Sequence, residues 1–206
     1  MANYISNIGA AVARLLVITI IVTTAIAVPA WAGKGNGSGI TPLSEDETVE
    51  LTYMREEEKL ARDVYLLMNQ VWSARIFDRI ATSEQRHMDT MGKMVDKYGL
   101  TDPALPDEGL FTDPYLQSKY YELIDIGDDS YVDGLYVGAT IEEIDMIDIQ
   151  HAIDVTTHVD VLNAYQNLLE GSKDHLRAYV GALETQGYIY SPQFISLELF
   201  DAIMDL

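Results

Sequence analysis

Apolar residues recur at alternating spacings of three and four along four long segments, a pattern typical of helices that face partner helices. These segments cover roughly 45–71, 74–98, 130–156 and 159–186. A shorter pattern predicts one helix near 115–126, inside the proline-containing connection between the second and third segments, and another predicts a closing helix over 196–205. Alternating strand patterns are scarce. The sequence therefore predicts an all-α domain, a four-helix bundle with a long crossover between its second and third helices.

Residues typical of helix ends border these segments. Ser44-Glu-Asp-Glu47 has the form of a capping box, and Ser73 and Ser130 stand where they can cap the second and third helices. Gly99 and Gly187 stand where C-terminal caps are expected. We therefore expect folded structure to begin near Ser44.

Polar residues interrupt the apolar face of each long segment near its middle. The second segment shows this most clearly, with one face made of Phe77, Ile80, Glu84, His87, Met91, Met94 and Tyr98. The corresponding faces carry Glu58 in the first segment, Glu142 and Asp145 in the third, and Ser172 and His175 in the fourth. Packing the four faces together would bring these carboxylates and imidazoles into one region inside the bundle.

Four carboxylates in that region cannot all stay ionised without compensation, because desolvation and mutual repulsion both oppose the charged form. Two divalent metal ions supply four positive charges, and they accept oxygen and imidazole ligands. The sequence therefore predicts a dinuclear metal site. Its six candidate ligands are Glu58, Glu84, His87, Glu142, Asp145 and His175.

Neighbouring residues leave alternatives open at two of these positions. Glu57 fits the first helix as well as Glu58, and the run REEEKLARD also fits a solvated helix face. Glu143 can replace Glu142 as the inward residue. Tyr65 and Tyr179 lie on the same faces as the candidate ligands and either touch the site or pack in the core.

Two features of the composition limit the function. Lys and Arg number 13 against 33 Asp and Glu, for a formal net charge of −20, and such a surface repels phosphate backbones, so we expect no nucleic-acid partner. The chain has no cysteine, which excludes disulfides and thiolate metal sites. Any metal must therefore be held by nitrogen and oxygen atoms.

The first 32 residues have the pattern of a signal peptide. Arg14 precedes an apolar run over 15–28, and Ala30-Trp31-Ala32 offers the small residues of a cleavage site. A retained membrane anchor is the alternative, since the apolar run can extend to cover 8–28. We expect an exported, extracytoplasmic protein of the cell envelope, anchored in the membrane if the leader is not cleaved.

A Gly/Ser-rich stretch follows the leader. We interpret 33–43, which contains GKGNGSG, as a flexible linker and 44–206 as the helical domain.

Three motifs at the candidate ligands resemble those of ferritin-like di-iron carboxylate proteins, especially the rubrerythrin-like branch. Glu58-Lys-Leu-Ala61-Arg62-Asp-Val-Tyr65 resembles the pattern E-x-x-A-R-x-x-Y, and Glu84-Gln-Arg-His87 matches E-x-x-H. Glu142-Glu-Ile-Asp145 resembles an E-x-x-E pair with aspartate in the last place. The wider sequence, from MREEEKLARDVY through GSKDHLRAY to GYIYSPQFIS, looks like the family catalogued as domain of unknown function 2202.

The resemblance implies a ferritin-like fold and selects Glu58 over Glu57. It also implies two metal ions, iron or alternatively manganese or zinc, in an oxidoreductase acting with dioxygen or peroxide as a ferroxidase or peroxidase. The fourth helix departs from the family pattern, because Ser172-Lys-Asp-His175 has serine in place of a ligand glutamate, so Asp145 becomes the candidate to complete the set.

The sequence also bears on partners and on an alternative function. No cysteine-rich rubredoxin module is present, so electrons would come from a separate donor. The alternative function is a non-enzymatic metal-binding or structural helical bundle of the cell envelope, or a bundle that only docks to another envelope protein. Assembly into a homo-oligomer is compatible with either function.

Overall fold

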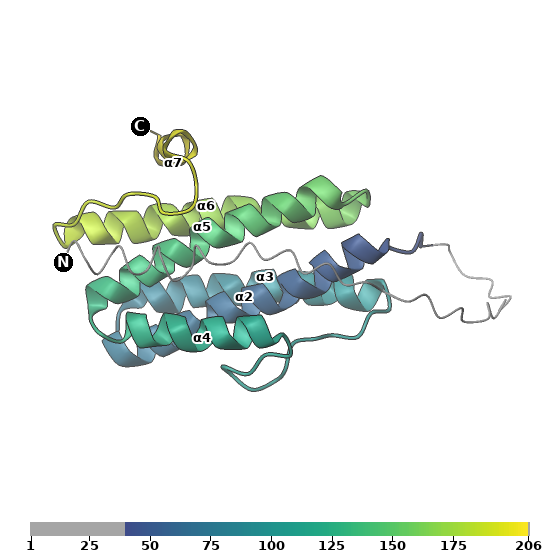
Figure 1. Cartoon of the computed structure of the whole chain (residues 1–206), viewed down its shortest axis with the longest axis horizontal. Coiled ribbons are helices and arrows are strands. Elements are labelled where there is room, and N and C mark those ends of the chain that lie inside the picture. Colours follow the sequence, from purple (N-terminus) through teal and green to yellow (C-terminus); the bar gives the residue numbers. More distant parts are fainter. Residues whose placement is uncertain (1–39, 206) are drawn as a thin grey trace, which may run out of the picture. The chain divides into compact units, whose positions relative to one another are not determined.

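The computed structural model describes residues 40–205, and six helices lie in this range (Figure 1). They are α2 (Glu45–Trp72), α3 (Arg75–Lys97), α4 (Pro114–Gly127), α5 (Tyr131–Val155), α6 (Val159–Thr185) and α7 (Leu197–Met204). The all-α prediction is confirmed, and each predicted helix corresponds to an observed one. The predicted leader and most of the linker lie outside the described residues. Between residues 40 and 205, no helix has both the length and the apolar character needed to cross a membrane.

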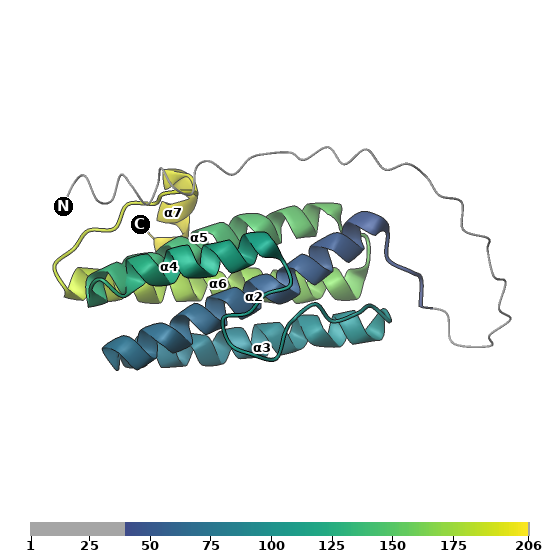
Figure 2. The ribbon, with the colours of Figure 1, turned by 60° about the horizontal axis from the view of Figure 1, so that its bottom comes forward.

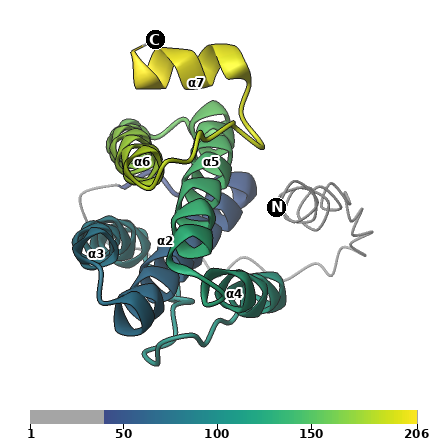
Figure 3. The same ribbon diagram turned by 90° about the vertical axis from the view of Figure 1, so that its left-hand side faces the viewer.

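Four of the helices, α2, α3, α5 and α6, pack into a bundle (Figure 3). Helix α2 lies beside α3 and α5, and α6 lies beside the same two helices. The connection from α3 to α5 is long, as predicted, and it carries α4, which packs against the outer sides of α2 and α5 (Figure 2). Helix α7 packs against α6.

Apolar side chains fill the bundle in two separate clusters. One contains Leu51, Met91, Val161 and their neighbours, and the other contains Val64, Phe77, Leu183 and theirs. On α2, α3 and α6 the two clusters lie on either side of the polar residues that interrupt the apolar faces. The layer of polar residues therefore lies between two layers of apolar side chains.

The helix ends follow the predicted signals with one exception. Glu47 N–H donates to Ser44 Oγ (3.1 Å) while Ser44 N–H donates to Glu47 Oε2 (2.9 Å), which completes the capping box. Ser130 Oγ accepts from Asp133 N–H (3.1 Å). The prediction that Ser73 caps α3 was wrong. With two residues between the helices, Ser73 instead ends α2 in a left-handed conformation (φ 50°), and its N–H donates to Asn69 O.

Glu47 also joins the start of α2 to the turn between α5 and α6. Its Oε1 accepts from Thr157 N–H (2.7 Å) and lies 2.7 Å from His158 Nδ1. The hydrogen bond to Glu47 raises the pKa of His158. Burial alone would raise the pKa of Glu47, but the contact with His158 and the hydrogen bonds from Ser44 and Thr157 lower it overall.

We expect the Glu47–His158 pair to stabilise the fold most between about pH 4.3 and 6.5, the unfolded-state pKa values of the two groups. The contribution of Glu47, whose pKa is lowered, is lost as the pH falls through its folded value. The contribution of His158, whose pKa is raised, is lost as the pH rises through its folded value. At pH 5.5, Glu47→Gln should cost about 1.5–3 kcal/mol, measured by urea unfolding, because charge-assisted hydrogen bonds are removed. A cost that does not change between pH 3 and pH 9 would contradict this explanation.

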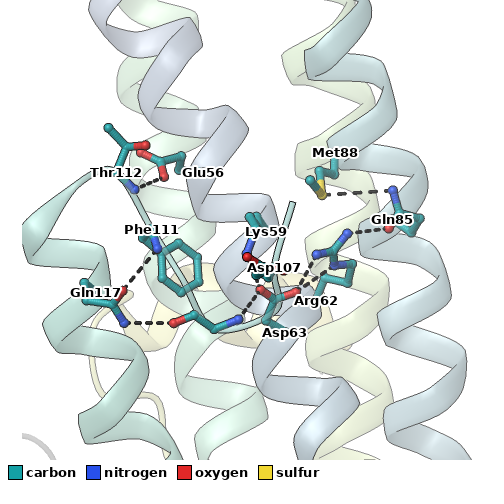
Figure 4. Close-up of polar contacts among 11 residues, drawn as sticks. Glu56, Lys59, Arg62, Asp63, Gln85, Met88, Asp107, Phe111, Thr112 and Gln117 are labelled. Atoms are coloured by element: carbon teal, nitrogen blue, oxygen red, sulfur yellow. Dashed lines mark hydrogen bonds and ion pairs between the residues drawn. The ribbon is translucent and has the colours of Figure 1, made fainter. Parts of the chain in front are cut away.

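A buried ion pair on α2 holds the connection that follows α3 (Figure 4). The Lys59 side chain is fully buried, and its Nζ donates to Asp63 Oδ2 (2.5 Å) and to the carbonyl of Asp107 (2.8 Å). Asp63 Oδ2 also accepts from Gly109 N–H (2.9 Å). Both charged side chains therefore have partners in the connection.

Glu56 holds the next part of the same connection. One of its oxygens accepts from Thr112 N–H (2.6 Å; Figure 4). The other accepts from Asp113 N–H (3.0 Å), just before α4 begins. Much of the run REEEKLARD is thus covered by the connection and by α3, and it does not form the solvated face considered from the sequence.

Candidate metal centre

Three carboxylates and two imidazoles meet in the polar layer, and each of the four bundle helices contributes at least one of them. They are Glu58 from α2, Glu84 and His87 from α3, Glu142 from α5, and His175 from α6. The three carboxylates are 1–2% exposed. The apolar faces on both sides of the layer explain this burial, because they drive the helices together and carry the polar residues inward.

Glu84 lies between the two histidines. Its Oε2 is 2.9 Å from His87 Nδ1, one helical turn further along α3, and its Oε1 is 2.7 Å from His175 Nδ1 on α6. Each oxygen of a single carboxylate therefore faces a different imidazole.

The five residues form two triads that share Glu84. The first contains Glu58, Glu84 and His87, and the second contains Glu84, Glu142 and His175. Within each triad the candidate ligand atoms all lie within 4.8 Å of one another. His87 Nδ1 is 3.3 Å from Glu58 Oε2, and His175 Nδ1 is 3.3 Å from Glu142 Oε2.

Several buried atoms of the triads have no hydrogen-bond partner of suitable geometry. Glu58 Oε1 is one of them, and the other two are Glu84 Oε1 and His175 Nδ1, which lie 2.7 Å from each other as an ion pair but are not aligned for a hydrogen bond. An unsatisfied buried polar atom is costly, so its presence needs an explanation. Carboxylate oxygens and imidazole nitrogens are ligands that Mn²⁺, Fe²⁺ and Zn²⁺ accept, and the donor set therefore fits two such ions.

The pKa values of these groups are shifted because buried carboxylates and imidazoles face one another. Burial raises the pKa of Glu58 to about 8. Burial would also raise the pKa of Glu84, but His175 and His87 lower it to about 2. Burial disfavours the charged histidines, yet the carboxylates raise the pKa of His87 to about 10 and that of His175 to about 11. Without a metal ion, protons on the two imidazoles supply the charge that the carboxylates require.

The two tyrosines considered from the sequence lie beside the second triad. Tyr65 OH donates to Glu142 Oε1 (2.6 Å), which leaves Glu142 Oε2 facing His175. The ring of Tyr179 lies 5.4 Å from that of Tyr65, and its buried hydroxyl has no hydrogen-bond partner. A Cβ atom on Gly138 would lie 2.4 Å from the Tyr179 ring, so only glycine fits there.

A family model described as "Uncharacterized protein domain (DUF2202)" matches residues 47–206, which include both triads. The chain belongs to the DUF2202 family. The resemblance to this family noted in the sequence is thereby confirmed.

A curated relative of this DUF2202 chain is "Uncharacterized protein MJ0754" of Methanocaldococcus jannaschii. It is 45% identical over 164 residues, which cover 79% of this chain and 89% of the relative. A crystal structure of hypothetical protein MJ0754 from Methanococcus jannaschii DSM 2661 is also similar, with a TM-score of 0.80 and 42% identity. The similarity covers 83% of this chain and 98% of that one. The helical arrangement described here is therefore shared with a solved structure.

Asp145, the sixth predicted ligand in this DUF2202 chain, lies outside both triads. It is buried, and its Oδ2 accepts from Ser172 Oγ (2.5 Å), the serine that replaces the expected glutamate of α6. Burial, followed by the nearby Glu58 and Glu142, raises the pKa of Asp145 well above its usual value. Its role as a ligand remains a prediction.

Glu143, the alternative to Glu142, is also buried but faces the C-terminal segment. It accepts from Tyr190 OH (2.7 Å) and from the backbone N–H groups of Gln193, Phe194 and Ile195. Adjacent glutamates on α5 thus serve different partners, because neighbouring helical positions point about 100° apart.

Gly171 is a residue near the site that the sequence analysis missed. A Cβ atom there would lie 2.5 Å from His87 Cε1 and 2.6 Å from His87 Nε2. The missing side chain therefore makes room for the imidazole. No local pattern in the sequence signals this contact, since it depends on how α6 packs against α3.

Proposed function

We propose that this protein binds two divalent metal ions inside the bundle, with iron the metal we favour, and that it uses them in oxidative chemistry with dioxygen or peroxide. The observation that carries the proposal is Glu84, whose oxygens lie 2.9 Å and 2.7 Å from the Nδ1 atoms of two different histidines. Glu84 could therefore contribute one oxygen to each of two ions held with the carboxylates and histidines of the facing helices.

The remaining residues divide between the two ions. Glu58 and His87 would hold one ion together with Glu84, and Glu142 and His175 would hold the other. When bound, such a pair of ions supplies Lewis acidity and exchangeable electrons. Tyr65 orients Glu142 by donating to its Oε1. The apolar clusters on both sides keep water from the carboxylates, which strengthens their attraction for cations.

The side of the centre between α3 and α6 is the most open to a small oxidant. The side chains of His87 and His175 are 13% and 10% exposed, whereas the three carboxylates are at most 2% exposed. Gly171 lies against His87 on this side and has no side chain to cover it. Dioxygen or peroxide would therefore approach past the imidazoles.

In the same proposal, the leader over 1–32 exports the domain or anchors it in the envelope, and a separate protein supplies electrons. The 206-residue chain has no cysteine to hold an electron-transfer centre of the rubredoxin type. The second candidate function is a non-enzymatic bundle in which the metal only joins the four helices. The enclosure of the triads between two apolar layers favours this stabilising role as well.

Elemental analysis of native protein purified without chelators tests the metal site, and we expect about two equivalents per chain, one for each triad. Adding Fe²⁺ to metal-free protein then separates the two functions. A redox centre should develop a near-ultraviolet absorption that requires oxygen, and a structural site should not. Bound metal without this absorption would contradict the oxidoreductase function but would support the metal site. Protein that takes up no metal would refute both functions.

A further inference from the structure

Helix α3 carries a row of basic side chains along its outer face, which we call the α3 stripe. All five are exposed, and they are Arg75, Arg79, Arg86, Lys93 and Lys97. At about 100° per residue, these positions fall within about 40° of one another, on the face opposite Glu84. Of the helices between residues 40 and 205, only α2 and α6 pack against α3, so none of them covers the stripe (Figure 3).

The cations of the stripe differ from the others in having few carboxylate partners. Within residues 40–205, each cation outside α3 forms an ion pair, and these are Arg55, Lys59, Arg62, Lys119, Lys173 and Arg177. Lys97, at the end of the stripe, pairs with Asp160. The side chains of Arg75, Arg79, Arg86 and Lys93 form no ion pair with any residue in that range. Four positive charges on one face therefore remain available to an external partner.

The stripe is centred at the level of the candidate metal centre. Arg86 directly precedes His87, and Arg79 and Lys93 lie seven residues to either side, about 10 Å along the helix axis. Glu84 lies on the inner side of the same helix and belongs to both triads. A partner bound to the stripe would therefore be separated from the centre by little more than one helix, whose diameter is about 10–12 Å.

The two edges of the stripe differ in charge. On the side of α2, where Arg62 donates to Gln85 (2.6 Å), three exposed aspartates border the stripe. They are Asp78, Asp89 and Asp96. Toward α6, the bordering residues Ser83 and Thr90 are uncharged. An anionic partner would therefore lie over the stripe and toward α6, the side on which the two imidazoles are most exposed.

We propose that the α3 stripe is the docking surface for the electron donor, and that this donor is a small acidic electron-carrier protein. The inference rests on the proposed function, in which a separate protein supplies electrons. Charge complementarity favours a compact acidic protein over an anionic membrane. A membrane would extend beyond the stripe and meet the three aspartates and the remaining surface of a chain whose net charge is −20.

The electron balance of this docking is simple. In each encounter the reduced carrier loses one electron, and the oxidised metal pair gains it. Two such transfers, together with two protons, reduce one molecule of peroxide to two molecules of water.

The effect of salt on association tests the stripe. The probe is a plant-type ferredoxin, a small acidic iron–sulfur protein, and its association with the metal-free chain would be measured by surface plasmon resonance. If net charge governed the encounter, salt would speed the association, because two acidic proteins repel each other. We expect the opposite. The association rate constant should fall as salt rises from about 20 mM to about 200 mM, because salt screens the attraction at the stripe.

Arg86→Glu should lower the association rate constant at low salt at least about ten-fold, the lower limit of electrostatic steering. Lys173→Glu is the matched control, because it changes the net charge equally. Lys173 is two residues from Gly171, which faces α3, so it lies on the opposite face of α6. The control should stay within about two-fold of the unmodified rate, since its charge is screened by salt. Circular dichroism should show unchanged helicity in both variants.

Electron transfer is measured separately, by mixing reduced ferredoxin with oxidised, iron-loaded protein in the absence of oxygen. Equal association rates for Arg86→Glu and Lys173→Glu would overturn the docking surface and leave the proposed function in place. The docking surface would also be wrong if phosphatidylglycerol vesicles bound in a way that depends on Arg86 and the ferredoxin did not. Association that depends on Arg86 but gives no electron transfer would contradict the proposed function, and the donor role with it.

Discussion

Glu84→Gln should abolish tight binding of both metal ions, whereas Glu58→Gln should abolish the binding of one. The amide keeps the volume of the side chain but removes the charge and one of the two oxygens that face His87 and His175. One ion then loses a ligand atom, and the other keeps only a neutral amide oxygen in place of a carboxylate. Loss of an outer partner of a ligand already weakens metal binding about 10–100-fold, so loss of the shared ligand should weaken both sites by more than about 100-fold. Metal content after dialysis, together with calorimetric titration of metal-free protein, measures the effect.

Comparing the two variants tests whether Glu84 is a ligand of both ions. Both replace one buried carboxyl group of the same layer with an amide, and both carboxyl groups would be ionised once metal is bound, so a general electrostatic effect on the bound ions would act similarly in each. Because Glu58 belongs to the first triad only, its variant should retain about one equivalent, held by Glu142 and His175 with Glu84. If Glu84→Gln also retained one ion at unchanged affinity, Glu84 would not be shared.

Helical periodicity explains why so much of the centre could be predicted from the sequence. Spacings of three and four fix the angle at which a side chain leaves its own helix, and the apolar residues on that face tell which angle points inward. Glu84 and His87 therefore had to lie inward with Ile80 and Met91. The same reasoning applies to Glu142 and His175, which now contribute to one triad.

Periodicity does not fix the rotation and register of one helix against another, and the contacts that depend on these were missed. Glu47 and His158 pair across the ends of two helices more than a hundred residues apart in sequence. Asp145 shares a face with Glu142, as expected, but the hydrogen bond that it accepts from Ser172 on α6 could not be predicted from periodicity. The sharing of Glu84 likewise depends on the position of α6 beside α3.

The run REEEKLARD was ambiguous for a different reason. Charged residues surround this part of α2 on nearly every side, so no apolar face chooses among them. The solvated face considered from the sequence is instead covered by the connection between α3 and α4, whose backbone bonds to Glu56 and Lys59 (Figure 4). Coverage by an irregular connection leaves no periodic signal in either segment.

Asp63→Ala should lower the free energy of unfolding by about 3–5 kcal/mol, the cost of leaving a buried charge without its partner. Lys59 is fully buried, and its ammonium would keep only the carbonyl of Asp107 and the ring of Phe111, which lies 4.5 Å from Nζ. Gly109 N–H would also lose its acceptor, which loosens the connection. Urea unfolding followed by circular dichroism measures the change in free energy.

Lys59→Met should cost less than Asp63→Ala, and this difference tests the explanation. In the methionine variant, Asp63 keeps the two hydrogen bonds from Arg62 (2.8 Å and 2.6 Å) and the one from Gly109 N–H, so its charge stays compensated. Methionine also fills most of the volume of the lysine stem. If Lys59→Met were the more costly change, packing of the stem rather than compensation of the buried charge would dominate. The asymmetry arises because the carboxylate has three donors around it, whereas the ammonium has one anionic partner.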